Sequence, residues 1–229
     1  MKTVLDTSVL CTGAFCLWKN PYSLISDLVS FGEIARKSGL WRGIIGCTKK
    51  DVPSHTDIIL IKDNGLIETR GMSWPKDLQG RFYYEEELTK NEYDQITAIA
   101  IWPALKQYPF LRDKVSDWLH GEDKLGYTYG INNLILDFEN KPTNINTPVC
   151  AMMGTFLLEF FAFLVKSYPE LNLTPVPIPT TWINTNGMGC NDQLEWFQEQ
   201  GWIVNHLKEV PDDNFDYNKP IEASLKDEV

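Results

Sequence analysis

One cysteine and one histidine of this sequence stand where a thiol could act as a nucleophile. Cys150 follows Thr147-Pro148-Val149 at the start of a long apolar run, and His55 opens the mostly apolar run from Thr56 to Ile61. A thiol is a weak nucleophile until a base or a helix N-terminus favours the thiolate. A strand histidine that faces a cysteine in the first turn of a helix would supply the base, and the helix would supply the N-terminus. The pair therefore predicts acyl-transfer chemistry at sulfur.

The segment around Cys150 carries the signals of a helix start. Thr147 can cap the helix, Pro148 suits its first turn, and the apolar run continues from Val149 to Val165. In that turn the sulfur would lie at the positive end of the helix dipole, near backbone N–H groups that could bind an oxyanion. A cysteine beside Ala151-Met152-Met153 is also typical of plain core packing, so position rather than residue type favours the catalytic role.

The residues after His55 predict a β-hairpin. Asn64-Gly65 is a strong turn signal, and a returning strand follows from Leu66 to Arg70. Glu68 on the returning strand could orient the imidazole as the third member of a triad. A two-residue turn would place Glu68 opposite Ile61, on the same face as His55 but several residues away. Contact would then need a bulge, a longer turn or strong twist, and a solvated charge is the equal alternative.

The remaining elements predict an α+β fold in which an antiparallel sheet packs against the helix of Cys150. Apolar spacing and turn signals indicate the following strands and helices. Strands are expected over Leu5 to Thr12, Phe82 to Glu87 and Gln95 to Trp102, and helices over Tyr22 to Ser38, Arg112 to His120 and Asn191 to Gln200.

A second candidate nucleophile is Cys16, which precedes His55 in the chain. Phe15-Cys16-Leu17-Trp18 is typical of buried packing, and Pro21 would limit any helix that Cys16 could open. Cys150 is therefore the better candidate.

These motifs, taken in chain order, resemble the circularly permuted papain-like amidohydrolases. This group is the YiiX-like branch of the NlpC superfamily and is related to lecithin:retinol acyltransferase. The resemblance extends roughly from Leu5 to Val165, and in the permuted branch the cysteine helix follows the histidine strand, as it does here. At two places the chain departs from the family, with Asp57 and Ala151-Met152 where members commonly have Gly and Ser-Glu. The motifs that carry the resemblance are Ser54-His55, Ile67-Glu68, Ile99-Ala100-Ile101, Tyr127-Thr128-Tyr129-Gly130 and Cys150.

The resemblance implies a circularly permuted papain-like fold with a thiol site. It implies that Cys150 is the nucleophile, His55 the base and Glu68 the third polar residue. It also suggests an aromatic side chain near the substrate or oxyanion, for which Tyr127 and Tyr129 are the candidates.

Composition excludes several other classes of protein. The formal charge of -10, without a cluster of Lys or Arg, argues against nucleic-acid binding. Five cysteines at irregular positions favour free thiols, and the absence of a Cys-x-x-Cys motif gives no support to a zinc site; no metal or cofactor is expected. The first residues do not form a secretory signal. The apolar run is shorter than a membrane span and contains Glu159, which favours a buried helix and no transmembrane segment.

The sequence thus predicts one thiol hydrolase or acyltransferase domain over residues 1–168, with a Pro- and Trp-rich extension, residues 169–229, packed on it and acidic from about 211. The substrate would be an amide or ester in a peptide, a lipid or a cell wall. The alternative is a catalytically inactive binding or structural module, such as a phage or assembly component. The expected location is cytoplasmic, with a virion-associated protein as the other option. Thiol reactivity would discriminate between enzyme and module.

Overall fold

A six-stranded antiparallel sheet forms the centre of the fold. The computed structural model describes residues 2–19, 29–32, 34–35, 40–46, 52–71, 84–87, 95–122, 150–185, 189–204 and 207–210. The strand order is β5-β4-β3-β2-β6-β7. These strands are β2 (Phe15–Trp18), β3 (His55–Ile61), β4 (Ile67–Gly71), β5 (Tyr84–Glu87), β6 (Ile96–Ala100) and β7 (Ile203–Val204). A separate two-stranded sheet pairs β1 (Lys2–Leu5) with β8 (Leu207–Val210).

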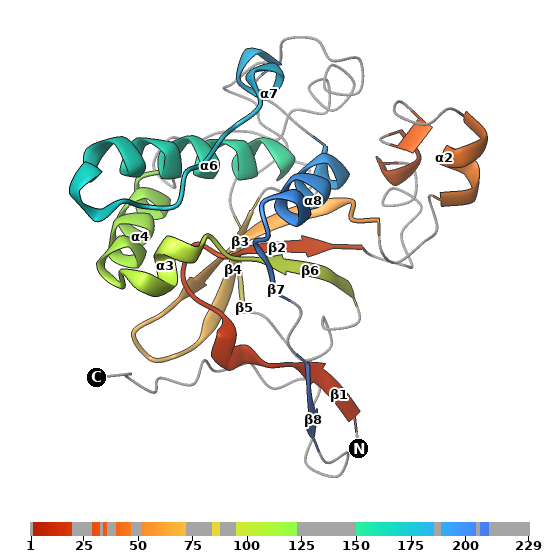
Figure 1. The fold of residues 1–229 in the computed structure, drawn as a ribbon. Coiled ribbons are helices and arrows are strands. Elements are labelled where there is room, and N and C mark those ends of the chain that lie inside the picture. Colours follow the sequence, from red (N-terminus) through yellow and green to blue (C-terminus); the bar gives the residue numbers. More distant parts are fainter. Residues whose placement is uncertain are drawn as a thin grey trace.

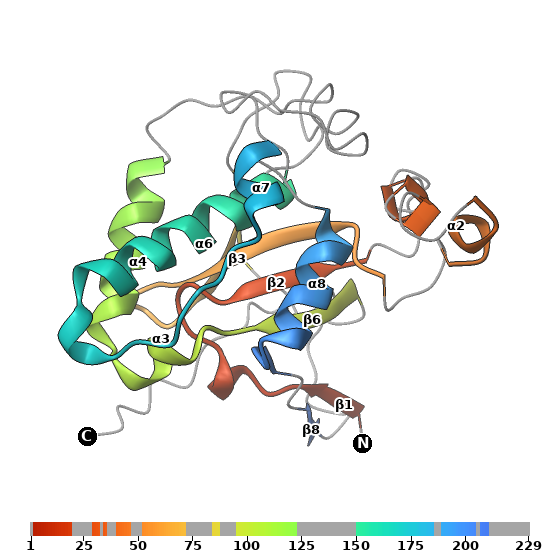
Figure 2. The same cartoon turned by 45° about the horizontal axis from the view of Figure 1, so that its top comes forward.

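Two helices lie over one face of the six-stranded sheet. Figures 1 and 2 show α6 running along β3, with α8 beside it over β2 and β6. The α+β class predicted from the sequence is therefore confirmed. The helices are α2 (Leu40–Gly46), α3 (Pro103–Gln107), α4 (Phe110–Glu122), α6 (Cys150–Ser167), α7 (Thr180–Thr185) and α8 (Cys190–Glu199), with 3-10 turns at Thr7–Val9 and Pro169–Leu171 and helical residues at 29–32 and 34–35.

Aromatic side chains join the sheet to both of these helices. Phe15 of β2 contacts Phe161 of α6 and Phe197 of α8, with ring centroids 6.1 and 4.7 Å apart. Trp102, just after β6, stacks on Phe161, and Trp202, just before β7, stacks on Phe197. Large rings of this kind contribute much of the buried apolar area of a core. They fix α6 and α8 against the sheet, and so fix the first residues of both helices.

Helix α6 is the one helix of the described residues that is long and apolar enough to cross a membrane by length and composition. More than half of its apolar window is buried within the protein. Phe161 and Leu157 are fully buried in the common core, whereas the exposed positions of the helix include Glu159. This burial is that of a core helix, in agreement with the sequence-based interpretation.

The β3–β4 hairpin is turned by three residues rather than two. Its strands pair Ile61 with Ile67, and the Lys62 N–H donates to the Leu66 carbonyl across Asp63-Asn64-Gly65. Gly65 has a φ of 83°, the left-handed conformation that closes a three-residue hairpin loop. The extra turn residue shifts the register by one relative to a two-residue turn.

Most predicted elements are present, but one central strand differs from the prediction. The strand expected over Leu5 to Thr12 is wrong, because β1 ends at Leu5 and a 3-10 turn follows at Thr7–Val9. The strand lies instead at Phe15–Trp18, the segment interpreted as buried packing. The predicted strands near Phe82 and Gln95 and the helices near Arg112 and Asn191 are confirmed with small shifts at their ends.

The chain beyond residue 168 takes part in the same core. It supplies β7 to the sheet, β8 to the pair with β1, and Trp196, Phe197 and Trp202 to the aromatic cluster. The division expected at residue 168 stays a prediction. The acidic tail from about 211 lies outside the described residues.

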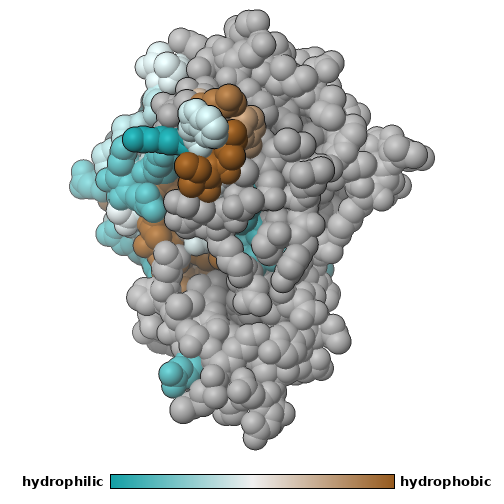
Figure 3. Space-filling view, turned by 90° about the vertical axis from the view of Figure 1, so that its right-hand side faces the viewer, coloured by the Kyte–Doolittle hydropathy of each residue, from teal (hydrophilic) through white to brown (hydrophobic). Residues whose placement is uncertain are grey.

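Helix α2 turns its small residues inward and its large ones outward. An added Cβ on Gly43 would meet Ala35 at 2.9 Å, and one on Gly46 would meet Ile34 at 2.7 Å, so both glycines lie against the preceding helical segment. Figure 3 shows the resulting apolar patch on the α2 side of the molecule. The exposed residues of this patch are Leu40, Trp41, Ile44 and Ile45.

Candidate active site

Strand β3 places His55 and Asp57 on the same face of the sheet. Residues two apart on a strand point the same way, and the His55 Nε2–Asp57 Oδ1 distance is 2.8 Å. Asp57 is buried at 2% exposure, whereas the His55 side chain is about a quarter exposed. Because a carboxylate only accepts hydrogen bonds, Nε2 carries the proton in this pair. The other ring nitrogen, Nδ1, is left for a second partner.

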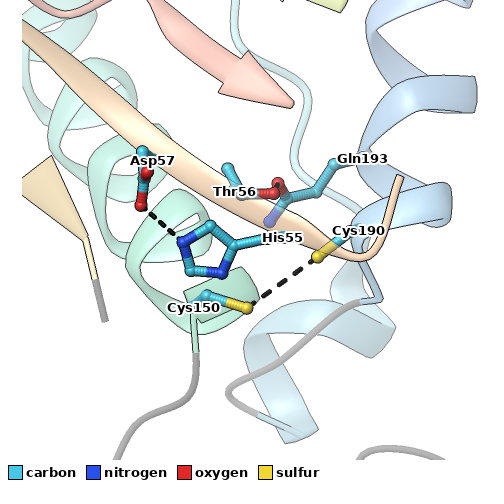
Figure 4. Close-up of polar contacts among 6 residues, drawn as sticks. All are labelled: His55, Thr56, Asp57, Cys150, Cys190 and Gln193. Carbon is cyan, nitrogen blue, oxygen red and sulfur yellow. Dashed lines mark hydrogen bonds and ion pairs between the residues drawn. The ribbon is translucent and has the colours of Figure 1, made fainter. Parts of the chain in front are cut away.

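That second partner is Cys150, the first residue of α6. Figure 4 shows Nδ1 of His55 directed toward the Cys150 sulfur, with Asp57 on the opposite side of the ring. The sulfur also accepts a hydrogen bond from the backbone N–H of Thr56. Cys150 is 5% exposed and begins an 18-residue helix, so its sulfur lies at the positive end of the helix dipole. The structure thus brings together the predicted nucleophile and the predicted base.

A second cysteine lies next to Cys150. The Cys150 and Cys190 sulfurs are 4.0 Å apart, and Cys190 is the first residue of α8. Figure 4 shows the two sulfurs directed toward each other, and both cysteines are buried. Two helix N-termini therefore converge on one pair of sulfurs, and both dipoles favour a negative charge there.

These contacts move the pKa values of the thiol and the imidazole in opposite directions. The pKa of Cys150 is held well below its usual range, first by the hydrogen bond from Cys190 and then by the charge and hydrogen bond of His55, which together outweigh burial. Burial lowers the pKa of His55, but the charges of Asp57 and Cys150 and their hydrogen bonds outweigh it and hold that pKa well above its ordinary value. Both shifts favour the thiolate form of Cys150 and the imidazolium form of His55.

The predicted third member of the triad, Glu68, is not part of this group. It pairs with Leu60 rather than Ile61 in the hairpin register, which turns its side chain to the face opposite that of His55. There it is buried and forms ion pairs with Arg70 and Lys62. The prediction that Glu68 orients the imidazole is therefore wrong, and the three-residue turn is the physical reason.

Asp57 fits into its position because the residue opposite has no side chain. Asp57 pairs directly with Gly71 at the end of β4, and a Cβ on Gly71 would overlap the Asp57 carboxylate. The carboxylate fills the space that a side chain at residue 71 would occupy. The absence of a side chain at Gly71 thus provides the space that the Asp57 carboxylate occupies when it contacts His55.

A buried glutamine connects α8 to α6 and β3. Gln193 of α8 donates from Nε2 to the Ala151 carbonyl at 2.6 Å, and its Oε1 accepts from the Thr56 hydroxyl at 2.8 Å. A Cβ on Gly154 would meet this amide at 2.5 Å, so the glycine provides its space. Gln193 therefore bonds to the residues immediately after both His55 and Cys150, and fixes the two segments relative to each other.

Three residues of this group were missed by the sequence analysis. Asp57 had a usable signal, because residues i and i+2 of a strand share a face and it follows His55 by two. Cys190 had a weaker one, because it opens the helix predicted near Asn191 much as Cys150 opens its own. Gln193 had none, since its partners lie far away in the sequence. Tyr127 and Tyr129, proposed near the substrate, lie outside the described residues.

In the described part of the chain, no group of three or more His, Cys, Asp or Glu side chains is arranged to hold a metal ion. Comparison with family models, with curated proteins and with solved structures finds no match to this chain.

Proposed function

We propose that the protein is a thiol hydrolase or acyltransferase that acts on an amide or ester bond, with Cys150 as nucleophile and His55 as general acid and base. The observation that carries this proposal is that His55 contacts both Cys150, at the N-terminus of α6, and Asp57. A nucleophile, a base and an orienting acid in this order form the arrangement that activates a weak nucleophile for acyl transfer.

The reaction follows from the charges of the pair. The Cys150 thiolate attacks the substrate carbonyl carbon, and the first-turn N–H groups of α6 stabilise the oxyanion. The His55 imidazolium gives its proton to the leaving amine or alcohol as the carbon–heteroatom bond breaks, which leaves a thioester on Cys150. Neutral His55 then removes a proton from water or from another acyl acceptor. The deprotonated acceptor attacks the thioester, and the Cys150 thiolate leaves. Asp57 keeps the imidazole oriented throughout.

We also propose that the fold belongs with the circularly permuted papain-like proteins. The support is the chain order of the site, since the histidine strand β3 precedes the cysteine helix α6, together with the antiparallel sheet against which that helix packs. Asp57 takes the orienting role that the resemblance assigned to Glu68. The substrate class remains an amide or ester of a peptide, a lipid or a cell-wall component.

The proposal predicts an unusually reactive thiol at one position. Iodoacetamide should label Cys150 rapidly below neutral pH, because thiolate is present there. Cys11 is an internal control, because burial raises the pKa of its thiol to about 11. Peptide mapping of the labelled chain measures both sites in one experiment.

Two variants complete this test. Cys150→Ser should remove the rapid labelling, and His55→Ala should slow it and move the pH profile of Cys150 upward, because the imidazolium no longer stabilises the thiolate. Labelling of Cys150 that is as slow as that of Cys11, or that does not respond to His55→Ala, would refute the enzyme and favour an inactive binding or structural module.

A further inference from the structure

The sulfur of Cys190 lies 4.0 Å from the nucleophilic sulfur, and the acyl-transfer steps form no bond to it. The two cysteines come from separate helices, and each is the first residue of its helix. The pairing of two sulfurs at this point suggests chemistry between them.

The backbone around Cys190 is held in place on both sides. The Gly189 N–H donates to the Asp192 carboxylate at 3.0 Å, which caps α8. One turn further, Gln193 bonds to Ala151 of α6 and to Thr56 of β3. The start of α8 is thus fixed against the start of α6, and the two sulfurs stay neighbours because the two helix ends do.

We propose that Cys150 and Cys190 form a redox pair that reduces hydrogen peroxide and closes into a disulfide. The first step uses the nucleophilic thiolate on which the proposed function also rests. Its sulfur attacks one peroxide oxygen, an S–O bond forms as the O–O bond breaks, and the leaving hydroxide takes a proton to become water. Cys150 is then a sulfenic acid.

In the second step Cys190 acts as the resolving thiol. Its sulfur, after losing its proton, attacks the Cys150 sulfur, an S–S bond forms, and the sulfenic oxygen leaves as a second molecule of water. Two thiols and one hydrogen peroxide thus give one disulfide and two waters. The sulfurs must approach from 4.0 Å to about 2.05 Å. Both lie at the ends of helices, where side-chain rotation provides part of this movement.

The disulfide has two consequences for the site. It removes the nucleophile, so acyl transfer stops while the bond exists. It also protects Cys150 from further oxidation to sulfinic acid, which thiol reductants do not reverse. The pair therefore makes oxidation of the site reversible.

The test is to treat the reduced protein with hydrogen peroxide and to map its peptides by mass spectrometry. The parent should yield a linked peptide that joins Cys150 to Cys190. It should lose rapid iodoacetamide labelling of Cys150 and regain it with dithiothreitol. In Cys190→Ser the same treatment should give sulfenic acid, trapped by dimedone, and then sulfinic acid, with no recovery. Cys11→Ser is the matched control and should behave like the parent.

The possible results separate the two proposals. Oxidation of Cys150 in the parent without a bridge to Cys190, while rapid labelling of the reduced chain persists, overturns the redox pair and leaves the proposed function standing. A bridge between Cys150 and another cysteine overturns it as well. Should Cys190→Ser fail to fold by circular dichroism, the linked peptide of the parent still decides the question.

Discussion

At the scale of single residues, the chemistry of the site depends on which acid faces His55. Two acids, Asp57 and Glu68, lie on the hairpin that His55 opens, and only the position of Glu68 depends on the length of the turn. The three-residue loop at Asp63-Asn64-Gly65 puts Glu68 on the other face of the hairpin. Asp57 shares the face of His55 through strand alternation alone, whatever the turn. Local geometry was therefore predictable, whereas cross-strand geometry depended on a register that the sequence left open.

Replacing Asp57 with Asn should lower the pKa of His55. The substitution keeps the shape of the side chain and removes a charge that raises this pKa. Because a protonated His55 stabilises the thiolate, the acid limb of Cys150 labelling should move to higher pH. NMR titration of the His55 ring protons measures the first effect directly. An unchanged midpoint would show that Asp57 has no electrostatic role.

Glu68→Gln provides the matched control. Glu68 lies on the other face of the sheet, so the titration of His55 and the labelling of Cys150 should match those of the parent. Stability should fall by about 1–3 kcal/mol, because buried Arg70 loses the Glu68 carboxylate as one of its partners. Chemical denaturation measures this loss. A shift of the His55 midpoint in this variant would restore Glu68 as a candidate for the orienting acid.

At the scale of elements, the helix starts and the hairpin were predictable and strand β2 was not. Cys150 follows a threonine and a proline, and Asn64-Gly65 follows an apolar strand, so both boundaries carry local signals. All four residues of β2, Phe15–Trp18, are buried, and a strand covered on both faces shows no alternation of apolar and polar residues. The packing of α8 against α6 had no local signal either, because it depends on Gln193 and its distant partners.

The end of strand β4 should tolerate no side chain at Gly71. In Gly71→Ala, the new methyl group would overlap the Asp57 carboxylate and push it away from His55. The pKa of His55 should fall as it does in Asp57→Asn, and stability should fall by about 1–3 kcal/mol from overpacking. NMR titration and denaturation measure the two effects.

Gly121→Ala is the control for this substitution. It lies in α4, and a Cβ there would meet nothing within 4 Å. It should leave the titration of His55 unchanged and stabilise the helix by about 0.5–1 kcal/mol. A normal His55 titration in Gly71→Ala would show that the carboxylate does not depend on this space.

At the scale of the whole molecule, the apolar patch of α2 lies apart from the core that positions the site. Trp41 and Ile45 are 77% and 67% exposed, whereas the site residues lie among buried side chains of β3, α6 and α8. The outward-facing residues of α2 therefore contribute little to folding.

Replacing Trp41 and Ile45 together with Gln should leave the free energy of unfolding within about 0.5 kcal/mol of the parent, as is usual for exposed positions. The labelling of Cys150 should also stay the same. Chemical denaturation and peptide mapping measure these two quantities. A loss of several kcal/mol would mean that the patch is buried in solution and belongs to the core.

The separation of β3 from α6 and α8 along the chain has a consequence for protein synthesis. On the ribosome, His55 and Asp57 emerge early, Cys150 much later, and Cys190 later still. A nascent chain that ends before α8 lacks the Gln193 bonds between the two halves of the site and the thiol that lowers the pKa of Cys150. Stalled chains of increasing length should therefore carry an ordinary, slow thiol at Cys150 until α8 has left the exit tunnel.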